Sequence, residues 1–211
     1  MAEPKQDRAV RTREAILYAA AEVMDEYGFA GASISKIAER AGATTGAMYF
    51  HFKSKEDLAL AVMNAQPETV MSHLDSTGMQ RLVDLTLVWS WRLQDDPLLR
   101  AGVRLAVEQG AFGLQDDTSF REWAQIMEDC LAAAREQGEL LASADPSEVA
   151  ELLVGACTGS QLHSQLTSGR GDLPERVVRM WRMLLPGIAV PAAVDRISLE
   201  VGRGRVGVTS R

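Results

Sequence analysis

The stretch SISKIAERAGATTGAMYFHFKSKED, residues 33–57, decides the fold of this chain. Ser33 and Ser35 offer caps for a short helix, and apolar residues recur at helical spacing across residues 34–38. Gly42 tolerates the left-handed backbone of a tight turn, and Thr44 can cap a second helix after it. Two short helices joined in this way form a helix-turn-helix, whose second helix enters the major groove of DNA. The segment therefore predicts a DNA-binding regulator.

Outward from this motif, nearly the whole chain has the periodicity of amphipathic helices. We find no internal repeat and no sustained alternating strand pattern, so the fold class is predicted as all-α. The boundaries predict a DNA-binding head, a larger helical body and a Gly/Arg-rich flexible tail: residues 1–54, 55–201 and 202–211. Besides the two short helices of this motif, helices are expected at residues 8–27, 55–72, 79–94, 97–111, 120–137, 147–167 and 174–186.

Caps and prolines mark several of these boundaries. Ser54 with Asp57 resembles a capping box, and Pro67 should end or kink the helix that this box begins. Asp96-Pro97 and Asp145-Pro146 each place an N-cap carboxylate before a proline in the first turn. Pro186 and Pro191 are expected to end the helix at residues 174–186 and to break the chain beyond it.

The charge of the chain is unevenly distributed. The net charge is −7, which does not fit an indiscriminate nucleic-acid binder. Residues 1–55 carry eight Lys/Arg and seven Asp/Glu, whereas the remaining residues carry 14 and 22. A near-neutral head on an acidic body suits DNA contact through one small face.

Composition also bears on the compartment. Cys130 and Cys157 lie in apolar helical patterns and read as reduced core cysteines, with a disulfide or redox switch as the alternative. No apolar run approaches the ~20 residues that span a bilayer. The polar start MAEPKQDR is not a signal peptide, so a soluble cytoplasmic protein is expected.

No pattern in the chain indicates an enzyme, a cofactor or a metal site. Gly202, Gly204 and Gly207 match G-x-G-x-x-G, but no βαβ unit surrounds them. The three histidines are scattered, and neither a Cys/His cluster nor a G-x-S-x-G motif occurs. A helical scaffold or enzyme without DNA binding stays open as a remote alternative.

With the motif and the acidic helical body in hand, the chain resembles the TetR family of one-component repressors over residues 8–57. A narrower resemblance, to the gamma-butyrolactone receptors of streptomycetes, covers nearly the whole chain. It rests on the stretches KQDRAVRTREAIL, AMYFHFKSKEDLA, RAGVRLAVEQGA, FREW, GELL, LLVGACTGSQ and MWRMLLPGIAVP. The resemblance implies that the body is a ligand-binding and dimerisation domain.

The resemblance also implies a set of DNA contacts, made by hydroxyls, a glycine, an aromatic residue, a histidine and basic residues that can reach phosphates or base edges. These are Arg11, Arg13, Thr44, Thr45, Gly46, Tyr49, His51 and Lys53. Each has a plain alternative, since Tyr49 could be a core aromatic and the basic residues ordinary solvated charges. One departure stands out: the family usually has Thr-Lys-Gly at this point, and Thr45 replaces the lysine.

For the ligand, the resemblance implies a mostly apolar chamber with few polar groups. Trp123 would cover the ligand, while the Thr158 hydroxyl and the Gln66 amide would bond to it; Leu85 and Trp89 are plausible lining. The alternative for each of these residues is ordinary core packing.

The implied function is a homodimeric repressor of antibiotic or secondary-metabolite genes. It would bind a near-palindromic operator and be released by a gamma-butyrolactone, butenolide or furan signal. The helices at 147–167 and 174–186 should pair with those of a second copy, with Leu152, Leu153, Val177, Met180 and Trp181 shared between interface and chamber. Rivals are a repressor that senses drugs and controls an efflux pump, and a pseudo-receptor that binds antibiotics.

Overall fold

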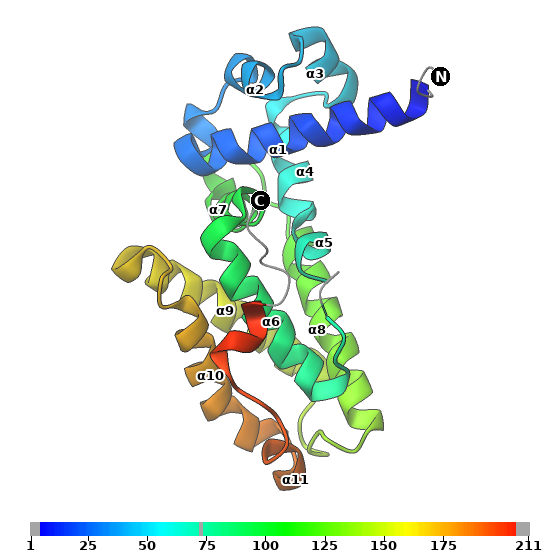
Figure 1. Ribbon diagram of the computed structural model, residues 1–211, viewed down its shortest axis with the longest axis vertical. Coiled ribbons are helices and arrows are strands. Elements are labelled where there is room, and N and C mark those ends of the chain that lie inside the picture. The colour runs from blue at the N-terminus through cyan, green and yellow to red at the C-terminus, as the bar shows by residue number, and fades with distance from the viewer. Residues whose placement is uncertain (1–4, 72–73, 206–211) are drawn as a thin grey trace. The chain divides into compact units, whose positions relative to one another are not determined.

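The computed structural model describes residues 5–71 and 74–205, and every regular element within these ranges is a helix (Figure 1). The prediction of an all-α fold is confirmed. The elements are α1 (Lys5–Gly31), α2 (Ile34–Ala41), α3 (Thr45–His51), α4 (Lys55–Asn64), α5 (Gln66–Met71), α6 (Gly78–Asp95), α7 (Pro97–Glu108), η1 (Gln109–Phe112), α8 (Thr118–Glu136), α9 (Pro146–Ser168), α10 (Leu173–Ile188), α11 (Pro191–Val194) and η2 (Val201–Arg205). No helix in the described part is long and apolar enough to cross a membrane.

The helix-turn-helix forms as its local chemistry predicts. Ser33 Oγ accepts the Lys36 backbone N–H at 3.3 Å and caps α2. Gly42 ends that helix in the left-handed conformation, with φ of 59°. Thr44 Oγ1 then accepts the Ala47 N–H at 3.1 Å and begins α3.

Most of the predicted helix boundaries are confirmed as well. Ser54 caps α4 through the Asp57 N–H at 3.0 Å, and Asp96 caps α7 with a proline in the first turn. The expected helix at 55–72 is interrupted at Ala65, shortly before Pro67, which lies in the first turn of α5. The prediction for Pro186 is wrong, because α10 continues through this residue to Ile188.

By their contacts, the described residues form two compact units. The first comprises the residues up to 66 together with 96–119, and the second comprises 67–95 together with the residues from 120 onward. The sequence-based boundary after residue 54 followed chain order and placed α7 in the body. In the structure, α7 packs against α1 and α4.

Charged groups as well as apolar burial hold α7 on α1 in the first unit. Arg100 Nε lies 2.7 Å from the Asp25 carboxylate, and Arg104 Nη1 donates to the Asp25 carbonyl at 2.9 Å. Gly28 has φ of 68° and lies so close to Arg104 that a Cβ there would be 2.7 Å from its Nη2. A glycine is therefore required where α7 meets the end of α1.

The second unit is built around α6, whose residues 82–90 are all buried. A buried hydrogen bond ties α10 to this helix: the Trp181 indole N–H donates to Thr86 Oγ1 at 2.8 Å. Cys130 and Cys157 are buried free thiols, as predicted, and burial raises the pKa of Cys157 to about 12.

The helical turn η2, at the end of the described residues, lies against α6 in the same unit. Residues 202–205 of the predicted flexible tail belong to η2, and Gly204 is buried. The prediction of a flexible tail did not anticipate the specific contacts that these residues make with α6. Residues 206–211 lie outside the described part of the chain.

Candidate DNA-binding face and ligand site

A groove of about 630 Å³ lies beside the recognition helix α3, within the first unit. Its walls come from α1, from the turn after α2 and from one face of α3. Among the lining residues are Arg8, Arg11, Thr44, Phe50 and His51. The lining contains no carboxylate, so its formal charge is positive although the chain as a whole is acidic. Such a groove can accept the sugar-phosphate edge of a duplex.

The exposed face of α3 carries the groups that can reach bases. The Thr44 hydroxyl accepts the cap bond from Ala47, which leaves its own proton able to donate to a phosphate. Thr45 and Gly46 are exposed in the first turn, and Tyr49 is 54% exposed. The alternative of Tyr49 as a core aromatic is thereby excluded for this unit, since Met48 and Phe52 fill the core instead.

The two arginines predicted on α1 as DNA contacts lie in different surroundings. Arg11 lines the groove, together with Thr44 and His51 from the predicted set. The Arg13 guanidinium instead lies 5.0 Å from the centre of the Phe52 ring, in a cation–π contact outside the lining of the groove. Lys53 is exposed just after α3, where its backbone N–H donates to the Asp57 carboxylate at 2.9 Å.

Sequence reasoning missed two residues of this face, Arg8 and Phe50. Phe50 is 80% exposed and packs edge-on against the His51 ring, with 5.0 Å between ring centres. A large apolar ring facing solvent on a recognition helix can contact thymine methyl groups. The available signal was its position two residues after Met48, which at about 100° per residue turns it onto the opposite, outer face of α3.

Four of the predicted ligand residues belong to the second unit. Leu85 and Trp89 on α6 are buried, as is Trp123 on α8. Thr158 on α9 is half-buried, and its hydroxyl donates to the Val154 carbonyl at 2.8 Å. The Thr158 hydroxyl would have to rotate to donate to a lactone carbonyl. Their shared lining of one chamber stays a prediction.

Gln66 belongs to the first unit and is 2% exposed. Its Nε2 donates to the Met63 carbonyl at 2.8 Å. The side chain lies flat on Gly102 of α7, where a Cβ would be 2.5 Å from Gln66 Cγ. In the described contacts, Gln66 thus packs α4 against α7.

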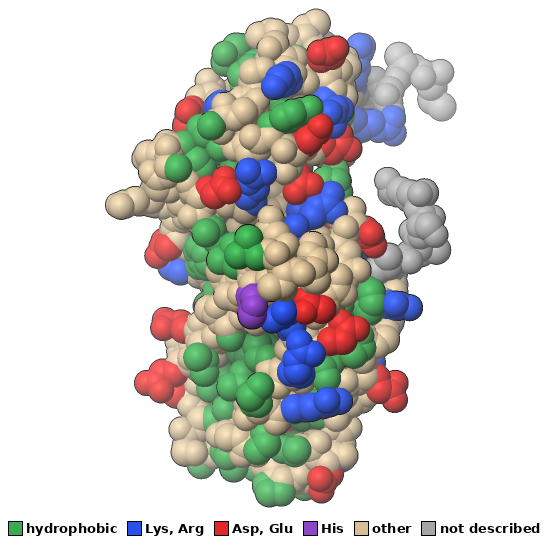
Figure 2. Space-filling model, turned by 90° about the vertical axis from the view of Figure 1, so that its left-hand side faces the viewer, with side chains coloured by type: hydrophobic (Ala, Val, Ile, Leu, Met, Phe, Trp, Pro, Cys, Tyr) green, Lys and Arg blue, Asp and Glu red, His purple; other side chains and the backbone are tan. Residues whose placement is uncertain are grey.

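A second groove of about 500 Å³ lies between α9 and α10 and is lined by Leu152, Gly159, His163, Arg176 and Met183 among others. This side of the second unit faces the viewer in Figure 2, where hydrophobic and basic side chains gather together. Of the five residues predicted for the interface, Leu152 and Met180 line this groove. The other three, Leu153, Val177 and Trp181, are buried in the core of the unit.

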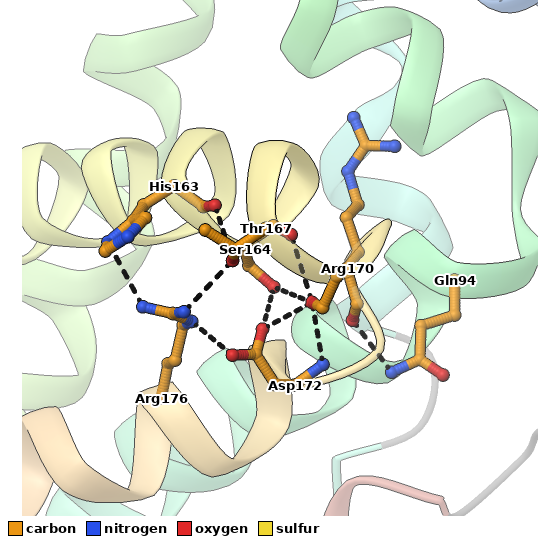
Figure 3. A network of polar contacts seen from close by, with 8 residues as sticks. Gln94, His163, Ser164, Thr167, Arg170, Asp172 and Arg176 are labelled. Carbon is orange, nitrogen blue, oxygen red and sulfur yellow. Dashed lines mark hydrogen bonds and ion pairs between the residues drawn. The ribbon is translucent and has the colours of Figure 1, made fainter.

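A polar network fixes one end of the groove (Figure 3). Arg176 reaches Asp172 Oδ2 at 2.8 Å, Thr167 Oγ1 at 3.1 Å and His163 Nδ1 at 3.1 Å. Because a guanidinium can only donate, His163 Nδ1 is the acceptor in this bond. The hydrogen bond from Arg176, followed by those from two serines, lowers the pKa of Asp172.

Comparison with known proteins identifies the family to which this chain belongs. Residues 16–62 match the family of bacterial regulatory proteins, tetR family, and residues 76–191 match the tetracyclin repressor-like C-terminal domain. The chain is 40% identical over 207 residues to the A-factor receptor protein of Streptomyces griseus, covering 98% of this chain and 73% of that protein.

Solved structures agree with these matches. TylP, a TetR regulator from Streptomyces fradiae, has a TM-score of 0.86 and 41% identity, covering 93% of this chain and 95% of its own. A gamma-butyrolactone receptor described as ArpA-like has a TM-score of 0.70 and 30% identity, covering 94% and 98%. The chain is a regulator of the TetR family.

Proposed function

We propose that this regulator is a homodimeric repressor that a gamma-butyrolactone-type signal, or a related butenolide or furan, releases from a near-palindromic operator. Its regulated genes would serve antibiotic or secondary-metabolite synthesis. The observation that carries the proposal is the similarity to the A-factor receptor over 98% of the chain, since it includes the body as well as the head. A regulator of this kind works on the chromosome, so we place it in the cytoplasm.

The groove beside α3 supports the DNA-binding part of this proposal. Arg8 and Arg11 would contact phosphates, while α3 presents Thr45, Tyr49 and Phe50 to the bases. Two such heads must lie about one helical turn apart, roughly 34–36 Å, to read a palindromic site.

The groove between α9 and α10 supports the dimer, with a second copy of the chain as its occupant. Gly155 and Gly159 are exposed on α9, and added Cβ atoms there would meet nothing within 4 Å, so another helix can approach closely. Met183 is 76% exposed and would be covered by the partner. Exposed Glu151 on α9 and Arg179 on α10 offer charges of opposite sign for a symmetric contact.

The buried residues of the second unit support the ligand site. Trp123 offers a large apolar face and one N–H donor for a lactone with an apolar chain. The ligand releases DNA only if it binds the released state more tightly than the DNA-binding state.

The test is a mobility shift of the protein on its own promoter region, with a panel of gamma-butyrolactones of increasing chain length. Abolition of the shift at low lactone concentration is the expected result. In Trp123→Ala the operator should still bind while release by lactone is lost. Release by unrelated antibiotics and not by lactones would favour the drug-sensing rivals, and the absence of any shift at low salt would overturn the proposal.

A further inference from the structure

Residues 198–205 run along α6 and attach to one stripe of it. The attachment points are Gln80, Asp84, Leu87 and Trp91, which follow one another at the spacing of successive helical turns. Figure 1 shows η2, coloured red, lying across α6. The contacts span three turns of the helix, so this is an extended attachment.

Both ends of this attachment use paired or directional bonds. The amide of Gln80 accepts the Ser198 N–H at 2.8 Å and donates to the Ser198 carbonyl at 3.2 Å. Near the other end, the Trp91 indole N–H donates to the Val201 carbonyl at 2.8 Å. The Arg205 guanidinium lies 4.2 Å from the centre of the Trp91 ring.

The centre of the attachment is an ion pair. Arg203 Nε and Nη2 contact the two oxygens of Asp84 at 2.7 Å and 2.8 Å, and Asp84 is only 7% exposed. Burial opposes ionisation of Asp84, but hydrogen bonds from Arg203, Ser76 and Gln80 outweigh it, so the pKa of the carboxyl is lowered. Without Arg203, α6 would keep a buried carboxylate that lacks its counter-charge.

Gly204 brings the segment into direct contact with the backbone of α6. A Cβ on Gly204 would lie 2.4 Å from the Leu87 carbonyl oxygen and 2.6 Å from Trp91 Cδ1. No side chain fits there unless the segment lifts away from the helix. The contact therefore requires one rotational position of α6 about its own axis.

We propose that residues 198–205 are an intramolecular clasp that restrains α6 and thereby raises the effector concentration needed for release of DNA. The proposal rests on the proposed function in one respect, because α6 also carries Leu85 and Trp89. At about 100° per residue, these two lie on the side of α6 opposite the clasp. A ligand that displaces α6 from its setting must break the bonds to Asp84 and Trp91, since they are all directional.

The test compares the full chain with two variants that disrupt the clasp. Arg203→Gln removes the positive charge that pairs with Asp84, and Gly204→Ala adds a Cβ that would strike the Leu87 carbonyl. Arg196→Gln is the matched control: it removes one positive charge two residues before the clasp, where Arg196 pairs with Glu139 at 3.5 Å and is 69% exposed. Hydrogen exchange measured by mass spectrometry on residues 78–95 needs no effector. We expect exchange in α6 to rise by about ten-fold or more in both clasp variants, while α1 and the control keep wild-type rates.

The second measurement is the concentration of the most potent lactone of the panel that half-releases the operator. This concentration should fall about five-fold or more in the clasp variants. Arg203→Lys should give an intermediate value, because a lysine can form only a single contact with Asp84. Unchanged exchange in α6 would overturn the clasp, whatever the effector is. If exchange in α6 rises but the half-releasing concentration stays unchanged, the clasp only stabilises α6, and its proposed effect on DNA release is refuted. If no lactone releases the wild-type protein, the proposed function fails, and the exchange measurement still decides whether the clasp restrains α6.

Discussion

Replacing Arg11 with alanine should lower the salt dependence of operator binding, whereas replacing Arg13 should not. Both arginines are exposed on α1 and only two positions apart, but only Arg11 lines the groove beside α3. Each phosphate contact contributes about 0.9 to the slope of log affinity against log salt. A dimer loses the contact in both heads, so the slope should fall by about 1.8. Between about 50 and 200 mM salt, the drop in affinity should then be roughly 12-fold smaller than in the wild type.

The assay is fluorescence anisotropy of a labelled operator, titrated at four or more salt concentrations. Arg13→Ala is the matched control, because it removes the same charge from the same helix. It should keep the wild-type slope and lose about 0.5–1 kcal/mol of stability with the cation–π contact to Phe52. Equal slopes in the two variants would refute the assignment of Arg11 to the DNA-binding face.

Three further predictions test the interior, the dimer face and the polar network. Gly102→Ala should lower the free energy of unfolding by about 1–3 kcal/mol in urea titrations, since its Cβ would strike a buried side chain, whereas Gly110→Ala should not destabilise the protein. Gly159→Glu should give a folded monomer in sedimentation experiments, because the position has open space in one copy and would meet the partner; a variant that stays dimeric places the interface elsewhere. Asp172→Asn should destabilise the protein equally at pH 6 and 8, because the lowered pKa keeps the carboxylate ionised there. That loss should shrink as thermal melts are taken below about pH 4, where the unfolded and then the folded carboxyl take up protons.

The features that the sequence predicted well are those set by neighbours in the chain. A hydroxyl at Ser33 or Thr44 needs only the backbone N–H three residues later to become a cap. Gly42 needs no partner at all to adopt its left-handed turn. Such local chemistry allowed the caps and the turn of the helix-turn-helix to be predicted from the sequence.

The assignment of single side chains to faces required the packed structure. Arg11 and Arg13 carry the same charge, but about 200° of helical rotation separates them, so one reaches the groove and the other covers Phe52. Phe50 lies among other aromatic residues in the sequence, and this pattern alone does not show which of them are buried. Burial of Met48 and Phe52 fixes the rotation of α3 and leaves Phe50 outside.

The tail shows most clearly what composition alone cannot predict. A Gly/Arg-rich end reads as flexible because its residues offer little to bury. Here the partner of Arg203 is a carboxylate 119 positions earlier in the chain, and Gly204 is needed because it has no side chain. The two residue types that suggested disorder are thus the two that make the attachment possible. Similar Gly/Arg tails in regulators of this family should be tested for a buried acid on the central helix before they are truncated for expression.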